Sequence, residues 1–88
     1  MAFTGMNIEQ VRQMAGQMEQ AAGEIEGITS KLTSVLDGTE WQGPDAEAFR
    51  GEWQGTHCTT LRQLQDRLRE VASQAKQNAM QQEQASQS

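Results

Sequence analysis

One proline divides this sequence into two long stretches of helix-forming residues. Pro44 lies at mid-chain, at the end of the segment Asp37–Pro44, which also carries both glycines of this region. A cluster of Gly, Pro, Asp and Thr marks a turn, whereas the flanking stretches are rich in Gln, Glu, Ala, Met and Arg, which favour helix. No alternating pattern predicts a strand. We predict a helix at about 7–37, a turn at about 38–43, a second helix at about 44–80 and a flexible polar tail at about 81–88.

Residues at the helix ends support these boundaries. Asn7 can cap the first helix, with Gln10 three residues later completing a capping-box-like pair. Gly38 stands where a left-handed C-terminal cap belongs. Pro44 is a favoured first residue of a helix, and Asp45 follows it at the positive end of the helix dipole. Because the connection is short, the two helices are expected to fold back antiparallel, as one domain over 1–88.

Apolar and small residues form a continuous stripe along each predicted helix. In the first helix they alternate between steps of three and four, the coiled-coil period, beside a second row spaced by seven. In the second helix an early run of steps of four approximates an eleven-residue repeat, which predicts a nearly straight or weakly right-handed first part. The first-helix stripe is Ile8, Val11, Ala15, Met18, Ala22, Ile25, Thr29, Leu32 and Leu36, with the second row Met14, Ala21, Ile28 and Val35; the second-helix stripe is Ala46, Phe49, Trp53, His57, Leu61, Leu64, Leu68, Val71, Ala75 and Ala79.

These stripes are wider than a two-helix hairpin can cover. A chain of 88 residues buries little surface, and its one cysteine allows no internal disulfide, so a partner is the remaining common means of stabilisation. We predict an all-α fold, an antiparallel two-helix hairpin that dimerises into a four-helix bundle; a lone, marginal hairpin is the alternative. The predicted dimer interface consists of Met14, Met18, Ile25, Ile28, Leu32, Leu61, Leu64 and Leu68.

Five glycines interrupt the predicted helices. Each weakens an exposed helix interior by roughly 1 kcal/mol relative to Ala. They are either tolerated weak points or places where two helices approach closely, and both interpretations stay open. The five are Gly16, Gly23, Gly27, Gly51 and Gly55.

The acidic balance of the chain argues against several classes of partner. The net charge is -5, whereas phosphate backbones and anionic lipids attract basic surfaces. No stretch approaches the roughly 18 apolar residues of a membrane span, and the first residues carry no basic region followed by an apolar run, so no cleavable leader is expected. Composition alone predicts a soluble intracellular protein that binds neither nucleic acid nor membrane.

No grouping of reactive side chains predicts catalysis or metal binding, so we expect no enzyme activity, no cofactor and no metal. His57 and Cys58 are neighbours, but adjacent helical residues point about 100° apart. Cys58 is expected either as a small buried hydrophobe or in an intermolecular disulfide. His57 is expected either as a partly buried interface residue or as a pH-dependent interface switch.

The turn and the start of the second helix carry a family resemblance. Trp41 and Gly43 frame the bend, and Ala46, Phe49 and Trp53 follow at helical spacing. A Trp-x-Gly at the bend of a helical hairpin of this length resembles the WXG-100 (ESAT-6-like) family, and the resemblance covers nearly the whole chain. From the residues alone, Trp41 is suited to plug the end of a bundle, and Gly43 either to adopt a backbone angle closed to other residues or to cap the helix.

The resemblance implies a small non-enzymatic protein exported by type VII (ESX-like) secretion as a folded dimer. It would be cytoplasmic before export and secreted afterwards, without a cleavable signal peptide. Its partners would be itself or a paralogous WXG-100 protein, and a secretion ATPase that recognises the Trp-x-Gly corner together with a C-terminal Tyr-x-x-x-Asp/Glu on one subunit. This sequence contains no tyrosine, so either a heterodimeric partner supplies that signal or a homodimer uses a variant of it.

Two other functions stay open at this point. The missing tyrosine is consistent with an intracellular escort that pairs with a larger secreted effector carrying a related hairpin. A membrane-active effector would insert amphipathic helices, and the Gln- and Glu-rich polar faces with the net negative charge speak against it.

Overall fold

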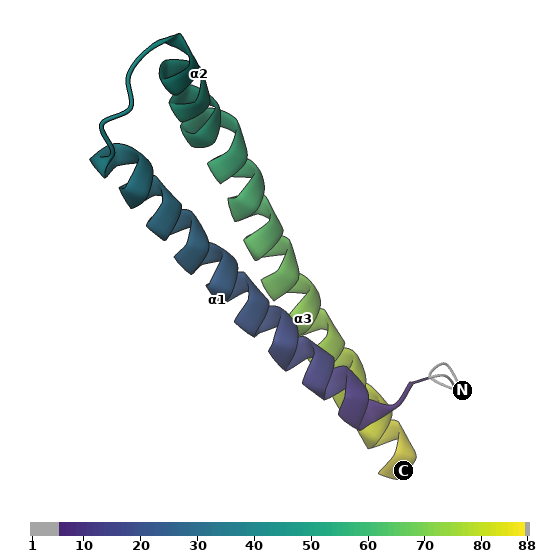
Figure 1. Cartoon of the computed structure of the whole chain (residues 1–88). Helices are drawn as coiled ribbons and strands as arrows, with labels where there is room; N and C mark the ends of the chain where they lie inside the picture. The colour runs from purple at the N-terminus through teal and green to yellow at the C-terminus, as the bar shows by residue number, and fades with distance from the viewer. Residues whose placement is uncertain (1–5, 88) are drawn as a thin grey trace.

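The computed structural model describes residues 6–87 as one helical hairpin, 66 × 17 × 14 Å in extent (Figure 1). Its elements are α1 (Ile8–Gly38), α2 (Pro44–Glu52), the π-helical turn η1 (Trp53–His57) and α3 (Cys58–Gln87). The last three follow one another without a break, so two rods run side by side and are joined by residues 39–43. The predicted all-α hairpin is confirmed, and its pairing into a four-helix bundle stays a prediction. Residues 1–5, which belong to the stretch expected to hold no cleavable leader, and Ser88 lie outside the described residues.

The helix starts agree with the sequence signals, but one predicted helix end does not. The side chain of Asn7 accepts a hydrogen bond from the backbone N–H of Gln10 at 3.0 Å, and Pro44 opens α2. The left-handed cap predicted at Gly38 is wrong, because this residue ends α1 in helical geometry and Thr39 leaves in extended conformation (φ -99°, ψ 133°). Among residues 6–87 only Gly43 has a positive φ.

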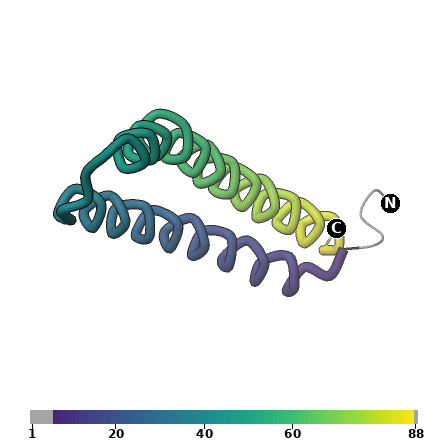
Figure 2. Tube along the Cα trace, turned by 45° about the horizontal axis from the view of Figure 1, so that its top comes forward, coloured from purple at the N-terminus to yellow at the C-terminus, as the bar shows by residue number. Residues whose placement is uncertain are grey.

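The second rod extends beyond its predicted end at about residue 80. The segment 81–87, predicted as a flexible tail, continues α3 to Gln87. Two contacts hold it against the start of α1, since Glu83 pairs with Arg12 at 2.8 Å and the amide of Gln82 donates to the carbonyl of Met6 at 3.3 Å. Figure 2 shows the two ends of the rods side by side at the pole opposite the turn.

Small side chains form the seam between the two rods. The buried apolar residues are alanines, apart from Trp53, which is 8% exposed. Val11 and Met18 pack against the edge of the alanine cluster. An alanine seam buries little apolar surface, and most of the large apolar side chains of the stripes lie outside it. The buried alanines are Ala15, Ala22, Ala46, Ala72, Ala75 and Ala79.

The π-helical turn η1 explains the steps of four at the start of the second predicted stripe. The backbone N–H of Cys58 bonds to the carbonyl of Trp53, five residues earlier instead of four. One extra residue is thereby accommodated in a single turn, so the eleven-residue repeat predicted here is wrong. In the middle of this rod the seam is formed by Cys58, Gln65 and Ala72, which are each more buried than the predicted His57, Leu64 and Val71 that directly precede them, whereas Ala75 and Ala79 are buried as predicted.

The helical glycines do not mark close approach of the two rods. A Cβ atom built at Gly16, Gly23, Gly27, Gly51 or Gly55 meets no neighbouring atom within 4 Å. The interpretation as points of close approach is therefore wrong within the hairpin, and the glycines are local weak points of their helices.

Candidate functional site

Arg50 holds the elbow between the rods together. Its guanidinium donates to the carbonyl of Leu36 from Nη2 at 2.9 Å and from Nε at 3.2 Å, to that of Thr39 at 2.8 Å, and to that of Trp41 at 2.6 Å. The carbonyls of the last turn of a helix have no partner within it. Arg50 satisfies one of them at the end of α1, in the place that a left-handed glycine cap would take. Sequence analysis missed Arg50, because no local pattern reports a contact across the turn.

Trp41 lies at the surface of the elbow and not in its core. Its side chain is 40% exposed. The guanidinium carbon of Arg50 stands 5.7 Å from the centroid of the indole, a cation–π contact, and Phe49 lies 6.5 Å from it, centroid to centroid. The ring is displayed in the single hairpin, and that Trp41 plugs the end of a bundle stays a prediction.

Four rings form a continuous aromatic row from the elbow into η1. Phe49 stacks on Trp53 with centroids 6.4 Å apart, and His57 lies 6.3 Å from Phe49 and 6.4 Å from Trp53. Trp53 is the buried member, and its indole N–H bonds to the hydroxyl of Thr33 on α1 at 2.9 Å. The structure thus brings Trp41, Phe49 and Trp53 together, as the sequence motif predicts, and adds His57 to them.

Gly43 makes the sharp change of direction into α2. Its backbone angles, φ 119° and ψ 176°, lie in a region open essentially to glycine alone. Its carbonyl accepts a hydrogen bond from the backbone N–H of Glu47 at 3.1 Å, which begins the first turn of α2. The prediction that Gly43 adopts an angle closed to other residues is confirmed. The motif alanine, Ala46, is fully buried directly after it.

Ion pairs line one edge of the hairpin, which we call the charged edge. They join Arg12 to Glu83 at 2.8 Å, Glu19 to Lys76 at 2.8 Å and Glu26 to Arg69 at 3.4 Å. On each rod the paired residues are seven positions apart, so the three pairs follow a single antiparallel register between α1 and α3. Because all six side chains are partly exposed, solvent screens the pairs and each contributes little to stability. Arg12 lowers the pKa of Glu83 through a hydrogen bond and its charge.

Large apolar side chains line the other edge, which we call the apolar edge. Met14 and Ile28 each follow an ion-paired residue of α1 by two positions, which places them about 200° around the helix. Ile28 is 58% exposed. Of the eight residues predicted for a dimer interface none is buried in the hairpin. Met14, Ile28, Leu32 and Leu64 are exposed, and Met18, Ile25, Leu61 and Leu68 are half-buried.

The adjacent His57 and Cys58 face different surroundings. His57 is the exposed last member of the aromatic row, whereas Cys58 is a half-buried free thiol that faces α1. Within residues 6–87 no three His, Cys, Asp or Glu side chains stand close enough together to hold a metal ion. No helix in that range is long and apolar enough to cross a membrane.

The Trp-x-Gly elbow agrees with what a comparison with protein families finds. The family described as WXG100, proteins of 100 residues with WXG, matches residues 4–87. The chain belongs to the WXG100 family. WXG100 proteins are small secreted helical proteins of the type VII secretion kind; the family is non-enzymatic, and its members generally form dimers. Comparisons with curated proteins and with solved structures found no match.

Two features of this WXG100 protein bear on its function. The motif residues Trp41 and Gly43 stand at the bend, with the tryptophan ring open to solvent and fixed by Arg50. The 88 residues hold no tyrosine, so the Tyr-x-x-x-Asp/Glu signal that the resemblance implies is not formed within them.

Proposed function

We propose that this WXG100 protein is exported through a type VII secretion apparatus as a folded dimer, and that it acts by binding other proteins. The apolar edge pairs with the same edge of a second hairpin, identical or paralogous. The elbow is part of the surface that the secretion ATPase recognises. The protein resides in the cytoplasm before export and outside the cell afterwards.

The observation that carries this proposal is the unequal distribution of apolar side chains. The seam within the hairpin uses alanines, and the large side chains at Met14, Ile28, Leu32 and Leu64 are 40–58% exposed along one edge. Contiguous exposed apolar surface on a small protein marks an interaction site. A second hairpin with the same edge would cover it and complete a four-helix bundle with knobs-into-holes packing.

The elbow supports the recognition step of the proposal. Arg50 binds the Trp41 carbonyl and stacks its guanidinium on the ring, so the exposed indole is held in one place before a partner arrives. Fixing an aromatic anchor in advance reduces the entropy lost on binding. Tryptophan and arginine are also the residues most enriched among interface hot spots.

The mass of the purified chain in solution tests the dimer. Multi-angle light scattering is expected to give twice the chain mass for the wild type, or a dimer only after a paralogous chain is added. Ile28→Asp places a charge on the apolar edge and is expected to give a monomer. Ser34→Asp, at an exposed position on the same helix outside the apolar edge, is the matched control. A wild-type monomer of full helicity that binds no other WXG100 chain would contradict the proposal.

Release into the medium tests the elbow. Trp41→Ala is expected to reduce export while helicity and dimer mass stay unchanged, and Gln42→Ala, its exposed neighbour, is expected to leave export unaltered. Equal export of the Trp41→Ala variant and the wild type would remove the recognition role of Trp41.

A second candidate function is favoured by the absence of tyrosine. If the signal for export is carried by another polypeptide, this chain would act inside the cell as an escort for a larger effector with a related hairpin. Co-purification with one long polypeptide, together with no release of the 88-residue chain, distinguishes this function from the first.

A further inference from the structure

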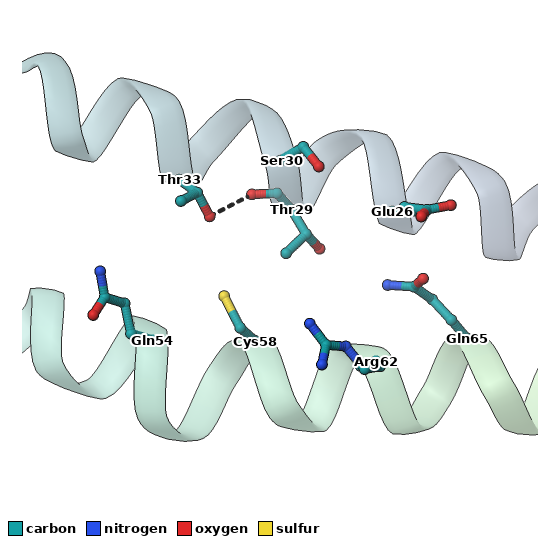
Figure 3. A pocket seen from close by; sticks show the side chains of 8 residues that line it. All are labelled: Glu26, Thr29, Ser30, Thr33, Gln54, Cys58, Arg62 and Gln65. Carbon is teal, nitrogen blue, oxygen red and sulfur yellow. Dashed lines mark hydrogen bonds between the residues drawn. The ribbon is translucent and has the colours of Figure 1, made fainter.

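A polar cavity opens between the rods, just beyond η1. Its volume is about 470 Å³, which lies within the range of small-ligand sites. Figure 3 shows Cys58, Arg62 and Gln65 of α3 facing Thr29 and Thr33 of α1 across the gap. The lining is rich in hydroxyl, amide and guanidinium groups, so the cavity suits a polar group. The remaining lining residues are Glu26, Ser30 and Gln54.

Arg62 is a basic residue of the charged edge that lacks the acid its neighbours have. Arg69 and Lys76 follow it at intervals of seven, and each pairs with a glutamate that lies across the seam on α1. Continuing that register by seven residues places Thr33 opposite Arg62. Among residues 6–87 no acid forms an ion pair with Arg62. The two neighbouring pairs indicate that this position accepts a carboxylate, which no residue of the described range supplies.

Gln65 adds a second donor inside the cavity. Its side chain is only 7% exposed, and it forms no hydrogen bond with any described residue. Buried amides are normally hydrogen-bonded, whereas the polar atoms of this amide have no protein partner and are not fully enclosed, since Gln82 Oε1 is the one fully buried side-chain atom without a partner among the described residues. In Figure 3 the amide of Gln65 points from α3 into the gap toward α1. A ligand with an acceptor oxygen would satisfy this amide together with the guanidinium of Arg62.

The two threonine hydroxyl groups of the α1 wall are already engaged. Thr33 donates to the carbonyl of Thr29 at 2.8 Å and accepts from the indole of Trp53, and Thr29 donates to the carbonyl of Ile25 at 2.7 Å. Arg62 and Gln65 on the α3 wall face these threonines as donors without a protein partner among residues 6–87, whereas the third hydroxyl of the α1 wall, on Ser30, is exposed.

We propose that this cavity binds a single carboxylate from outside the chain, with the guanidinium of Arg62 as the charged donor and the amide of Gln65 as the second. Guanidinium groups hold carboxylates with two parallel hydrogen bonds. Glu26 at the rim carries a negative charge of its own, which disfavours a doubly charged phosphate. The carboxylate belongs either to an acidic side chain of a partner protein or to a free small acid.

The site is independent of the proposed dimer. Glu26, Thr33 and Arg62 lie in the row of the charged edge, about 200° around their helices from Ile28, Val35 and Leu64. A second hairpin on the apolar edge leaves the cavity open. Loss of binding here and loss of dimerisation are therefore separate outcomes with separate variants.

Titration with a minimal carboxylate, followed by nuclear magnetic resonance, tests the site. N-acetylglutamate N-methylamide added to the full chain is expected to shift the side-chain amide signals of Gln65 with millimolar affinity, and the uncharged N-acetylglutamine N-methylamide is expected to leave them in place. Arg62→Gln is expected to weaken binding about tenfold or more, the effect of losing a charge-assisted hydrogen bond. Arg67→Gln makes the same change in net charge at an exposed residue outside the cavity and is expected to bind as the wild type.

Equal shifts with the glutamine probe, or equal affinity in the Arg62→Gln variant, would overturn the proposal, as would the absence of any shift at Gln65. A second probe, a helical peptide whose only charged residue is one glutamate, distinguishes the two sources of the carboxylate. Tighter binding of the peptide than of the free probe indicates a partner protein, and equal binding indicates a small acid. Both of these results support the carboxylate site.

Discussion

The indole N–H of Trp53 donates a 2.9 Å hydrogen bond to the hydroxyl of Thr33 across the seam. The same hydroxyl donates to the carbonyl of Thr29, one turn earlier in α1. Trp53 is the only large apolar side chain that is buried among residues 6–87. The hydrogen bond therefore fixes the position of the largest core residue relative to the opposite rod, close to the elbow.

Removing either partner of this hydrogen bond is expected to destabilise the hairpin. Trp53→Phe leaves the Thr33 hydroxyl without its donor, and Thr33→Val leaves the indole N–H unpaired. Each is expected to lower the free energy of unfolding by about 1–3 kcal/mol. Because both remove one interaction, the double variant is expected to lose about 0.5–1.5 kcal/mol less than the sum. Urea unfolding of the four proteins measures this, and strictly additive losses would refute the coupling.

Arg50→Lys is expected to loosen the elbow although the charge is kept. A lysine ammonium cannot reach three carbonyls at once with the planar fork that arginine offers. We expect a loss of about 1.5–3 kcal/mol in the free energy of unfolding, typical of hydrogen bonds to charged groups. Hydrogen exchange is expected to speed up first at residues 36–41. The same substitution at the exposed Arg67 is expected to change stability by less than about 0.5 kcal/mol.

Alanine substitutions at two glycines are expected to act in opposite directions. Gly43→Ala forces a residue with a Cβ atom into φ 119°, which costs about 1–3 kcal/mol. Gly16→Ala replaces a helical glycine with open space around it, and is expected to stabilise by up to about 1 kcal/mol. Thermal unfolding, monitored by circular dichroism, is expected to show a lower melting temperature for Gly43→Ala and a higher one for Gly16→Ala. A stabilised Gly43→Ala variant would contradict the backbone argument.

Acid is expected to release the last turns of α3 from α1. Arg12 holds the pKa of Glu83 below its ordinary value of 4.5, so the folded state binds this proton less readily than the unfolded state. The stabilisation that the Arg12–Glu83 pair provides is present above about pH 4.5 and is lost as the pH falls through the lowered pKa of Glu83. Amide exchange in 80–87 is expected to accelerate in that window. Glu83→Gln is expected to remove the pH dependence of this segment and leave the middle of the hairpin unchanged.

Periodicity and end signals sufficed to predict both rods, their antiparallel return and the turn around Trp41 and Gly43. These features depend on neighbours within a few residues, for which side-chain chemistry is decisive. The end of the second rod was placed too early because contacts of Gln82 and Glu83 with α1 stabilise a segment whose own composition is polar. Contacts between distant residues leave no local pattern.

The cluster at the elbow could be predicted in part. Phe49 and Trp53 are one helical turn apart, so their contact follows from spacing. Arg50 was missed because its partners are backbone carbonyls across the turn. The sequence does not predict that Cys58 takes the place of His57 in the seam. Steps of four are compatible both with an undistorted α-helix and with a turn that holds one extra residue.

The wide turn at 53–57 has a consequence for related chains of different length. In a relative that lacks one residue of η1, this segment would form ordinary α-helix. The residues equivalent to Trp53 and Cys58 would then be four positions apart instead of five and would still lie on one side of the helix. A one-residue gap farther along α3 would instead rotate everything after it by about 100°. Alignment gaps within this helix are therefore expected to gather between Trp53 and His57, where natural variation in length does least harm.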